Sequence, residues 1–272
     1  MRPTRSRPHQ YRAFTLLEVS LVVGILVVLS AMVVPTFIRQ LKEDELPRSA
    51  RQLRSMITLV RANAAFDNLR YQIRFPNEDE LDPLGGERQP LIEREDDPID
   101  DPEVFNLVTA PWAVGNTLLG DVWCAEVRLG RPTIEEIRTR RERAAENIEE
   151  ELEELFEDID PERPPLFVEP DGSSEWVTFV LTTAPRDIEL EELEDYPQVD
   201  LIVDGATGLA WLQRPFYEEE LDLFEEKNWP AVLRQDFLDP RVLTEDDVLE
   251  IRESQLRGAE VQVQGRELEV EP

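Results

Sequence analysis

The chain begins with a short basic segment, followed by an apolar run as long as a membrane-spanning helix. From Phe14 to Val34 the only ionisable side chain is Glu18, and an α-helix needs about 20 apolar residues to cross a bilayer. Segment 1–13 contains four arginines and no acid, and such positive charge keeps the flanking end of a membrane helix in the cytoplasm. The pattern predicts a single-pass membrane protein whose C-terminal bulk lies on the other side.

Beyond this run the hydrophobic pattern becomes one-sided. Apolar residues recur at helical spacing, which indicates an amphipathic helix packed on a sheet; they are Leu53, Met56, Ile57, Val60 and Ala64. Pro47 predicts a kink or break, with the helix resuming at Ser49. We expect one long, kinked helix over 14–68, transmembrane over 14–34 and amphipathic over 49–68.

Alternation of apolar and polar residues, together with runs of β-branched and aromatic residues, predicts strands downstream. The candidate strand segments are 69–75, 104–108, 121–129, 166–181 and 199–211. The acidic, proline-rich stretch 76–103 has little periodic hydrophobicity and is predicted to be a long exposed loop. The expected fold class is α+β: the long N-terminal helix packed on an antiparallel β-sheet head over 69–215.

A helical insertion is predicted within this head, over residues 133–160. Thr133 and Glu136 form a capping-box pattern at its start, and prolines from Pro161 onwards end it. Most of its surface is polar, which favours a solvated arm over the alternative, a coiled-coil partner site.

Residues 216–272 form an acidic C-terminal extension of the head. Within it we expect a helix over 246–256, capped by Thr244 and ended by Gly258. Alternating valines around a Gly-Arg pair predict a terminal hairpin over 261–270.

Composition narrows the possible chemistry. The formal charge is −31, and residues 14–272, without the four arginines of segment 1–13, carry −35, which repels nucleic acid and anionic lipid surfaces. The single cysteine, Cys124, cannot form an intramolecular disulfide and is expected to be a buried hydrophobe. The sole histidine, His9, lies in segment 1–13, so residues 14–272 have no imidazole for a nucleophile or zinc site. We expect no catalytic residue, cofactor or metal ligand, although Ca²⁺ binding by the acidic loop stays open.

Glu18 needs an explanation, because a carboxylate costs roughly 2.5 to 3.5 kcal/mol at the centre of a bilayer. The basic leader, a small residue, Phe-Thr-Leu-Leu-Glu and an apolar helix together resemble the class III signal of type IV pilins and type II secretion pseudopilins. This resemblance implies that prepilin peptidase cleaves between Ala13 and Phe14 and N-methylates Phe14, whose amine then pairs with Glu18 of a neighbouring subunit. The family usually has Gly where this chain has Ala13.

Two other interpretations of the N-terminus remain. An ordinary signal peptide has an apolar core of 7 to 15 residues and a small-residue cleavage site, and an acid at the start of that core fits it poorly. A plain membrane anchor explains the hydrophobicity and leaves Glu18 without a role.

Two downstream segments carry a second resemblance. Leu166–Leu181 contains a Phe-x-x-Pro-Asp-Gly-Ser turn, and Val199–Trp211 contains Asp-Gly and Thr-Gly pairs. Both place residues that tolerate positive φ between runs of β-formers, which predicts two antiparallel hairpin-like units. The segments look like the head of H-type minor pseudopilins and their FimT-like relatives.

The resemblance implies a minor pseudopilin, a non-enzymatic subunit anchored in inner-membrane lipid with a periplasmic head. Its partners would be prepilin peptidase, other major and minor pseudopilins, and secreted substrates, with no nucleic acid. One alternative is a FimT-like minor type IV pilin in pilus assembly or DNA uptake, although the acidic tail 216–272 suits DNA poorly. Another is a membrane-anchored periplasmic enzyme that uses paired carboxylates.

Overall fold

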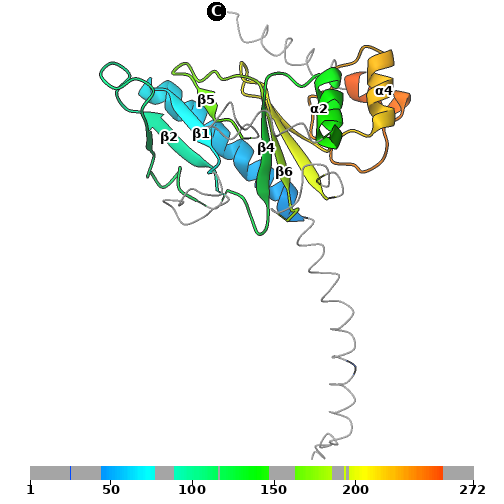
Figure 1. Ribbon diagram of the computed structural model, residues 1–272, viewed down its shortest axis with the longest axis horizontal. Helices are drawn as coiled ribbons and strands as arrows, with labels where there is room; N and C mark the ends of the chain where they lie inside the picture. Colours follow the sequence, from blue (N-terminus) through cyan, green and yellow to red (C-terminus); the bar gives the residue numbers. More distant parts are fainter. Residues whose placement is uncertain are drawn as a thin grey trace, which may run out of the picture. The chain divides into compact units, whose positions relative to one another are not determined.

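The computed structural model describes residue 25 and residues 44–76, 89–115, 117–146, 163–185, 193 and 196–253. Contacts divide the chain into two compact units, Met1–Asp44 and Glu45–Pro272, and nearly all described residues belong to the second. That unit is α+β, as predicted, and contains two antiparallel sheets of four strands each (Figure 1).

Each sheet combines strands from distant parts of the chain, and every neighbouring pair is antiparallel. The first sheet has the order β3-β2-β1-β5, with β1 Tyr71–Arg74, β2 Leu91–Glu95, β3 Phe105–Leu107 and β5 Leu166–Val168. The second has the order β4-β6-β7-β8, with β4 Trp123–Leu129, β6 Val177–Thr182, β7 Gln198–Val203 and β8 Ala210–Gln213.

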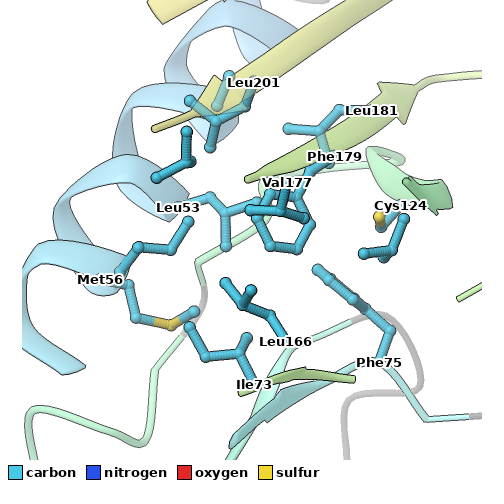
Figure 2. Packing of buried hydrophobic residues seen from close by; sticks show 14 of the residues in the cluster. Leu53, Met56, Ile73, Phe75, Cys124, Leu166, Val177, Phe179, Leu181 and Leu201 are labelled. Carbon is cyan, nitrogen blue, oxygen red and sulfur yellow. The ribbon is translucent and has the colours of Figure 1, made fainter. Parts of the chain in front are cut away.

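One helix, residues 44–67, packs on both sheets, and we call it the spine helix (blue in Figure 1). Its predicted apolar stripe is buried, with Leu53 fully enclosed. Leu53 belongs to the same core as Ile73 of the first sheet and Phe179 and Leu201 of the second (Figure 2). Each such side chain contributes about 1.5 to 3 kcal/mol on burial, so the spine helix joins the two sheets into one core. Cys124 is buried in it, as predicted.

The helix break predicted at Pro47 is absent, because residues 44–50 are helical throughout. Proline removes one backbone donor, but the flanking Leu46 and Ala50 are 4% and 0% exposed and pack in the core. The part of the predicted helix before residue 44 lies outside the described residues, except Ile25.

The loop predicted over 76–103 is wrong in part, because β2 lies within it. Leu91 and Ile92 are buried, and β2 is the partner of both β1 and β3. One of the charged residues of this strand is compensated by β1, since Arg74 Nη2 lies 2.9 Å from Glu93 Oε1. Residues 77–88 of the predicted loop lie outside the described residues.

Only one of the two predicted hairpin-like units is a hairpin. β7 and β8 pair as expected, in the register Val203↔Ala210. The unit over Leu166–Leu181 is wrong in part: one antiparallel bridge, Val168↔Ser174, closes its turn, but β5 pairs with β1 while β6 pairs with β4 and β7. Its turn leads the chain from the first sheet to the second. Turn residues determine where the chain bends, but they do not determine which strand the next segment pairs with.

The helical insertion and the C-terminal extension form a second core together. Helix α2, Ile134–Glu146, begins after Thr133, whose Oγ1 accepts a hydrogen bond from Glu136 N at 3.1 Å. Helix α4, Glu218–Glu226, is not predicted from the sequence, and residues 245–253 form a further helix. We call α2 together with residues 214–253 the C-terminal subdomain.

The solvated arm predicted for 133–160 is therefore wrong over its described part. Ile134 and Ile137 of α2 pack on the buried residues of the C-terminal subdomain, and α2 and α4 lie side by side (Figure 1). The buried members of this core are Phe216, Leu221, Phe224, Leu233, Phe237, Leu243 and Val248. Residues 147–160 and the hairpin predicted over 261–270 lie outside the described residues.

Candidate assembly surface of the head

The residues predicted for cleavage, methylation and assembly, Ala13, Phe14 and Glu18, lie outside the described residues. Within the apolar run only Ile25 is described, as a helical residue that is 52% exposed. Among the described residues, no helix has both the length and the apolar character to span a bilayer. The part of the predicted assembly element that can be examined is the spine helix, which follows that run in the chain.

The first turns of the spine helix are held by the loop before β4. Ser49 is fully buried, and its Oγ accepts a hydrogen bond from Leu119 N at 2.9 Å. Gln89 holds the same loop, because its Oε1 accepts hydrogen bonds from Thr117 N at 2.7 Å and Leu118 N at 2.9 Å. Side-chain acceptors thus satisfy backbone donors of this loop, and Ser49 joins the loop to the spine helix.

The later turns of the spine helix are held where two tight turns meet. Arg61 Nη1 donates hydrogen bonds to Gly205 O at 2.8 Å and to Ser174 Oγ at 3.3 Å, and Ser174 N donates to Gly205 O at 3.1 Å. We call Arg61 with the turns 169–174 and 204–209 the turn junction. It brings together the two segments that carry the second resemblance, which are far apart in the sequence.

Three glycines make this close approach possible. A Cβ on Gly205 would overlap the carbonyl oxygens of Ser174 and Glu175. Gly208 has φ +73°, and a Cβ there would lie 2.8 Å from Arg61 Nε; Gly172 has φ +78°. Because L-residues with a side chain adopt this left-handed region only at a cost, the Asp-Gly and Thr-Gly pairs serve packing as well as turning.

The turn junction is also organised electrostatically. Burial lowers the pKa of Arg61, and the negative charges of Asp204 and Asp171 act in the opposite direction. Hydrogen bonds from the Ser173 hydroxyl and backbone lower the pKa of Asp171. A cation of the spine helix and two carboxylates of the turns are therefore held together at this junction.

A second arginine connects the spine helix to the C-terminal subdomain. Arg54 Nη1 lies 3.1 Å from Asp236 Oδ1 and donates to Ala210 O at 3.4 Å. The same Asp236 Oδ1 accepts a hydrogen bond from Leu212 N at 3.0 Å. The spine helix, the edge strand β8 and the C-terminal subdomain thus meet at one carboxylate.

The opposite face of the spine helix is exposed and carries a regular stripe. Its members follow one another at alternating intervals of four and three residues: Arg48, Gln52, Ser55, Leu59, Ala62 and Phe66. Such 4-3 spacing keeps side chains on one side of a helix and is the spacing of helix-packing seams. Leu59 is 45% and Phe66 is 88% exposed. We call this set the exposed stripe.

Two arginines at the N-terminal end of the exposed stripe have side chains without a partner among the described residues. Arg48 lies in the stripe and Arg51 beside it, both are exposed, and neither side chain forms an ion pair or hydrogen bond in the part of the chain that the structure describes. In contrast, Arg54 and Arg61 of the same helix are both engaged. Although the chain has 60 acidic and 29 basic side chains, these two arginines outnumber the one exposed acid at this end of the helix, Asp44, which lies one turn before Arg48.

The C-terminal subdomain contains a buried ion pair that the sequence did not predict. Glu220 is 0% exposed, and its carboxylate accepts two hydrogen bonds from Arg214, at 2.7 and 2.8 Å. Tyr217 N and Leu243 N donate to the same carboxylate at 2.8 and 2.6 Å. Arg214 also donates to Asp239 O at 2.6 Å. In a tail rich in glutamate, nothing in the local sequence distinguishes Glu220 from its neighbours.

No described group of three or more His, Cys, Asp or Glu side chains is arranged to hold a metal ion. The candidate functional residues in the described part of the chain are therefore the contacts that hold the spine helix in place and the exposed stripe on its other face. No protein-family model, no curated protein and no solved structure matches this chain.

Proposed function

We propose that this chain is a minor pseudopilin, a structural and non-enzymatic subunit of the periplasmic pseudopilus of a type II secretion system. The sequence support is the leader with Ala13, Phe14 and Glu18 ahead of an apolar helix. The structural observation that carries the proposal is the spine helix, which forms the core of the head with one face and presents the exposed stripe with the other. A subunit that stacks through its N-terminal helix needs both faces.

In this proposal prepilin peptidase removes residues 1–13 and methylates the amine of Phe14. The resulting ammonium pairs with Glu18 of a neighbouring subunit, so that neither charge stays alone in lipid, where each would cost several kcal/mol. The head lies in the periplasm and contacts other pseudopilins or secreted substrate, while residues 14–34 lie in the inner membrane.

The test combines processing with assembly in a strain that has an active prepilin peptidase. Intact mass spectrometry of the membrane-extracted chain is expected to show loss of residues 1–13 and gain of one methyl group. Glu18→Leu is expected to insert and to be processed like wild type, but not to enter filaments, because the ammonium of the neighbour loses its partner.

The matched control is Ala13→Gly, which restores the usual family residue and is expected to be processed and assembled like wild type. A leader that stays uncut on the wild-type chain contradicts the proposal. Glu18→Leu that assembles and supports secretion normally contradicts the charge-pairing step alone.

A further inference from the structure

Among the four sheet edges of the described head, the β3 edge lacks the features that protect the others. β8 is bridged on its outer side by Phe237, and β5 is bridged by Ser174 of its own turn. β4 carries the charged residues Glu126 and Arg128 and a bulge beside Glu126. Covering segments, charged side chains and bulges each hinder the addition of another strand to an edge. Within the described residues, β3 has none of these.

The β3 edge lies in an uncharged stretch of the chain. Residues 104–108, Val-Phe-Asn-Leu-Val, include no ionisable residue and no proline, although 33% of the whole chain is charged. Pairing with β2 continues past the end of β3, because Val108 N donates to Ile92 O at 2.8 Å. Val104 is 52% exposed, and Asn106 is exposed as well. The outer edge of the first sheet therefore presents uncharged residues to its surroundings.

The hydrogen-bond pattern shows which backbone groups of this edge face outward. Residues two apart in an antiparallel strand bond to the same neighbour. Since Val108 bonds to β2, Asn106 also faces β2, and the backbone N–H and C=O groups of Phe105 and Leu107 point away from it. These groups form no hydrogen bond within the part of the chain that the structure describes. They have the alternating arrangement that an antiparallel partner strand requires.

The side chains of Phe105 and Leu107 lie on one face of the sheet, because strand residues two apart share a face. Phe105 packs there against Phe167 of β5, with ring centroids 5.7 Å apart. Both Phe105 and Leu107 are half-buried. A strand added at this edge would therefore place every second side chain beside an apolar surface.

The segment just before β3 gives the edge a negative end. Segment 96–103 contains five acids and no basic residue. Asp100 and Asp101 are exposed, and neither side chain forms an ion pair or hydrogen bond among the described residues. Ile99 beside them is 88% exposed. A cationic side chain at this end of an added strand would meet carboxylates that no described arginine or lysine neutralises.

We propose that β3 binds an extended segment of a different protein as an additional strand of the first sheet, antiparallel to β3. The segment has apolar side chains at alternate positions, aligned with Phe105 and Leu107. A lysine or arginine lies at its C-terminal end, which the antiparallel direction places beside segment 96–103. In such strand addition the backbone bonds supply affinity and the alternate side chains supply specificity. The inference does not depend on the pseudopilin function.

Charge selects a different protein over two occupants from this chain. A second copy brings another −31 charges, and chains of such like charge repel one another. Segment 254–272 has alternating apolar and polar residues, but it contains four acids and two arginines. Its negative excess matches segment 96–103 poorly. A basic, extended segment satisfies both the backbone groups and the carboxylates.

The experiment titrates a fluorescent synthetic peptide with the full-length chain in a lipid nanodisc and follows its anisotropy, with empty nanodiscs as background. The peptide alternates valine and threonine and ends in two lysines. We expect saturable binding, with slower hydrogen exchange at the Phe105 and Leu107 amides and little change at Asn106, whose amide faces β2. The same peptide ending in two glutamates should bind at least about tenfold more weakly.

N-methylated peptides test the backbone bonds without changing the protein. In the proposed register the valine amides face β3 and the threonine amides face solvent. Methylation of the valine amides should weaken binding by about tenfold or more, because the added strand loses its donors. Methylation of the threonine amides should leave binding nearly unchanged. Equal effects of the two modifications would overturn the proposal.

Variants of the chain test the same contact from the other side. Leu107→Pro removes an outward-facing donor and no bond to β2, and edge strands accept proline at such positions; binding should fall by about fivefold or more. Asp100→Lys combined with Asp101→Lys should reverse the preference in favour of the peptide ending in glutamates. The matched control, Asp246→Lys with Glu250→Lys, makes the same charge change on exposed acids of the C-terminal subdomain and should leave the preference unchanged.

Four results overturn the proposal. The first two are no binding of the peptide ending in lysines, and protection of amides other than those of Phe105 and Leu107. Binding that requires deletion of residues 254–272 would assign the edge to the chain's own tail. A dimer of this chain that Leu107→Pro abolishes would assign the edge to a second copy. Removal of the leader is measured separately, so the pseudopilin function stands or falls independently of this contact.

Discussion

Three glycines in the described head differ in how strictly the structure requires glycine. Gly115 has no neighbour within 4 Å of an added Cβ, Gly130 has φ +97° but open space, and Gly208 combines φ +73° with close contact to Arg61. Position 115 therefore does not require glycine, position 130 requires a residue that adopts positive φ, and position 208 requires both positive φ and the absence of a side chain. Residue identity alone does not distinguish them.

Alanine substitution at these glycines should follow the same order. Gly115→Ala is expected to change the free energy of unfolding by less than about 0.5 kcal/mol, Gly130→Ala to lower it by about 1 to 2 kcal/mol, and Gly208→Ala to lower it further. Urea unfolding followed by tryptophan fluorescence measures all three. Equal losses at Gly130 and Gly208 would show that the turn junction tolerates the added methyl group.

The buried pair Arg214–Glu220 predicts a large penalty for removing one partner. Glu220→Ala leaves a guanidinium with about 10% exposure without its carboxylate and is expected to cost about 3 to 5 kcal/mol. The double change Arg214→Met, Glu220→Leu should cost clearly less, because no charge stays buried. Urea midpoints of the two variants give the comparison, and a double variant as unstable as Glu220→Ala would contradict this account.

At the scale of elements, the spine helix shows how one sequence pattern serves two surfaces. Leu53 and Leu59 lie on the same helix, but Leu53 is 0% and Leu59 is 45% exposed. Apolar spacing correctly predicted the buried stripe, because the residues from Leu53 to Ala64 that pack in the core are apolar. The exposed stripe was not predictable from the sequence, because Gln52, Ser55 and Ala62 can be recognised as one face only when the packed face is known.

Leu53→Ala and Leu59→Ala are a matched pair that separates these two faces. Leu53→Ala should lower the free energy of unfolding by about 2 to 5 kcal/mol, because it leaves a cavity between the two sheets. Leu59→Ala should change it by less than about 0.5 kcal/mol. The measurement is urea unfolding of each variant; a Leu53→Ala variant as stable as wild type would contradict the assignment of Leu53 to the packed core.

The cap of the 245–253 helix predicts a pH dependence. Thr244 N and Oγ1 both donate hydrogen bonds to Asp247 Oδ2, at 2.9 and 2.6 Å. Hydrogen bonds from the Thr244 side chain and backbone lower the pKa of Asp247 below its ordinary value of 3.8. Since the folded form holds the charged carboxylate more strongly, the cap stabilises the helix above that ordinary value and is lost as pH falls through the lowered pKa.

Hydrogen exchange of the amides in 245–253 should therefore accelerate as pH drops below about 4, after correction for the intrinsic rate. Asp247→Asn should remove the acid-induced part of this change, because its side chain does not titrate. An identical corrected pH profile in both proteins would assign the effect to other carboxylates.

At the scale of the whole molecule, the long-range pairings were not predictable from local patterns. β5 and β6 are separated by a short turn and yet belong to different sheets. Residues 133–160 and 216–272 look like separate additions to the head in the sequence, but their described parts share one core. Both results follow from complementarity between surfaces that are far apart in the chain, which local periodicity does not record.

Local sequence patterns were enough to predict the α+β class, the buried stripe of the spine helix, most strand positions and the caps at Thr133 and Thr244, because these depend on period, propensity and turn chemistry over a few residues. Four features were not predictable in this way: β2 is a strand, Arg61 joins two distant turns, Glu220 is a buried carboxylate among many acids, and α2 packs on the C-terminal extension. Burial and charge compensation in these cases come from partners far along the chain, and only the folded protein brings them into contact.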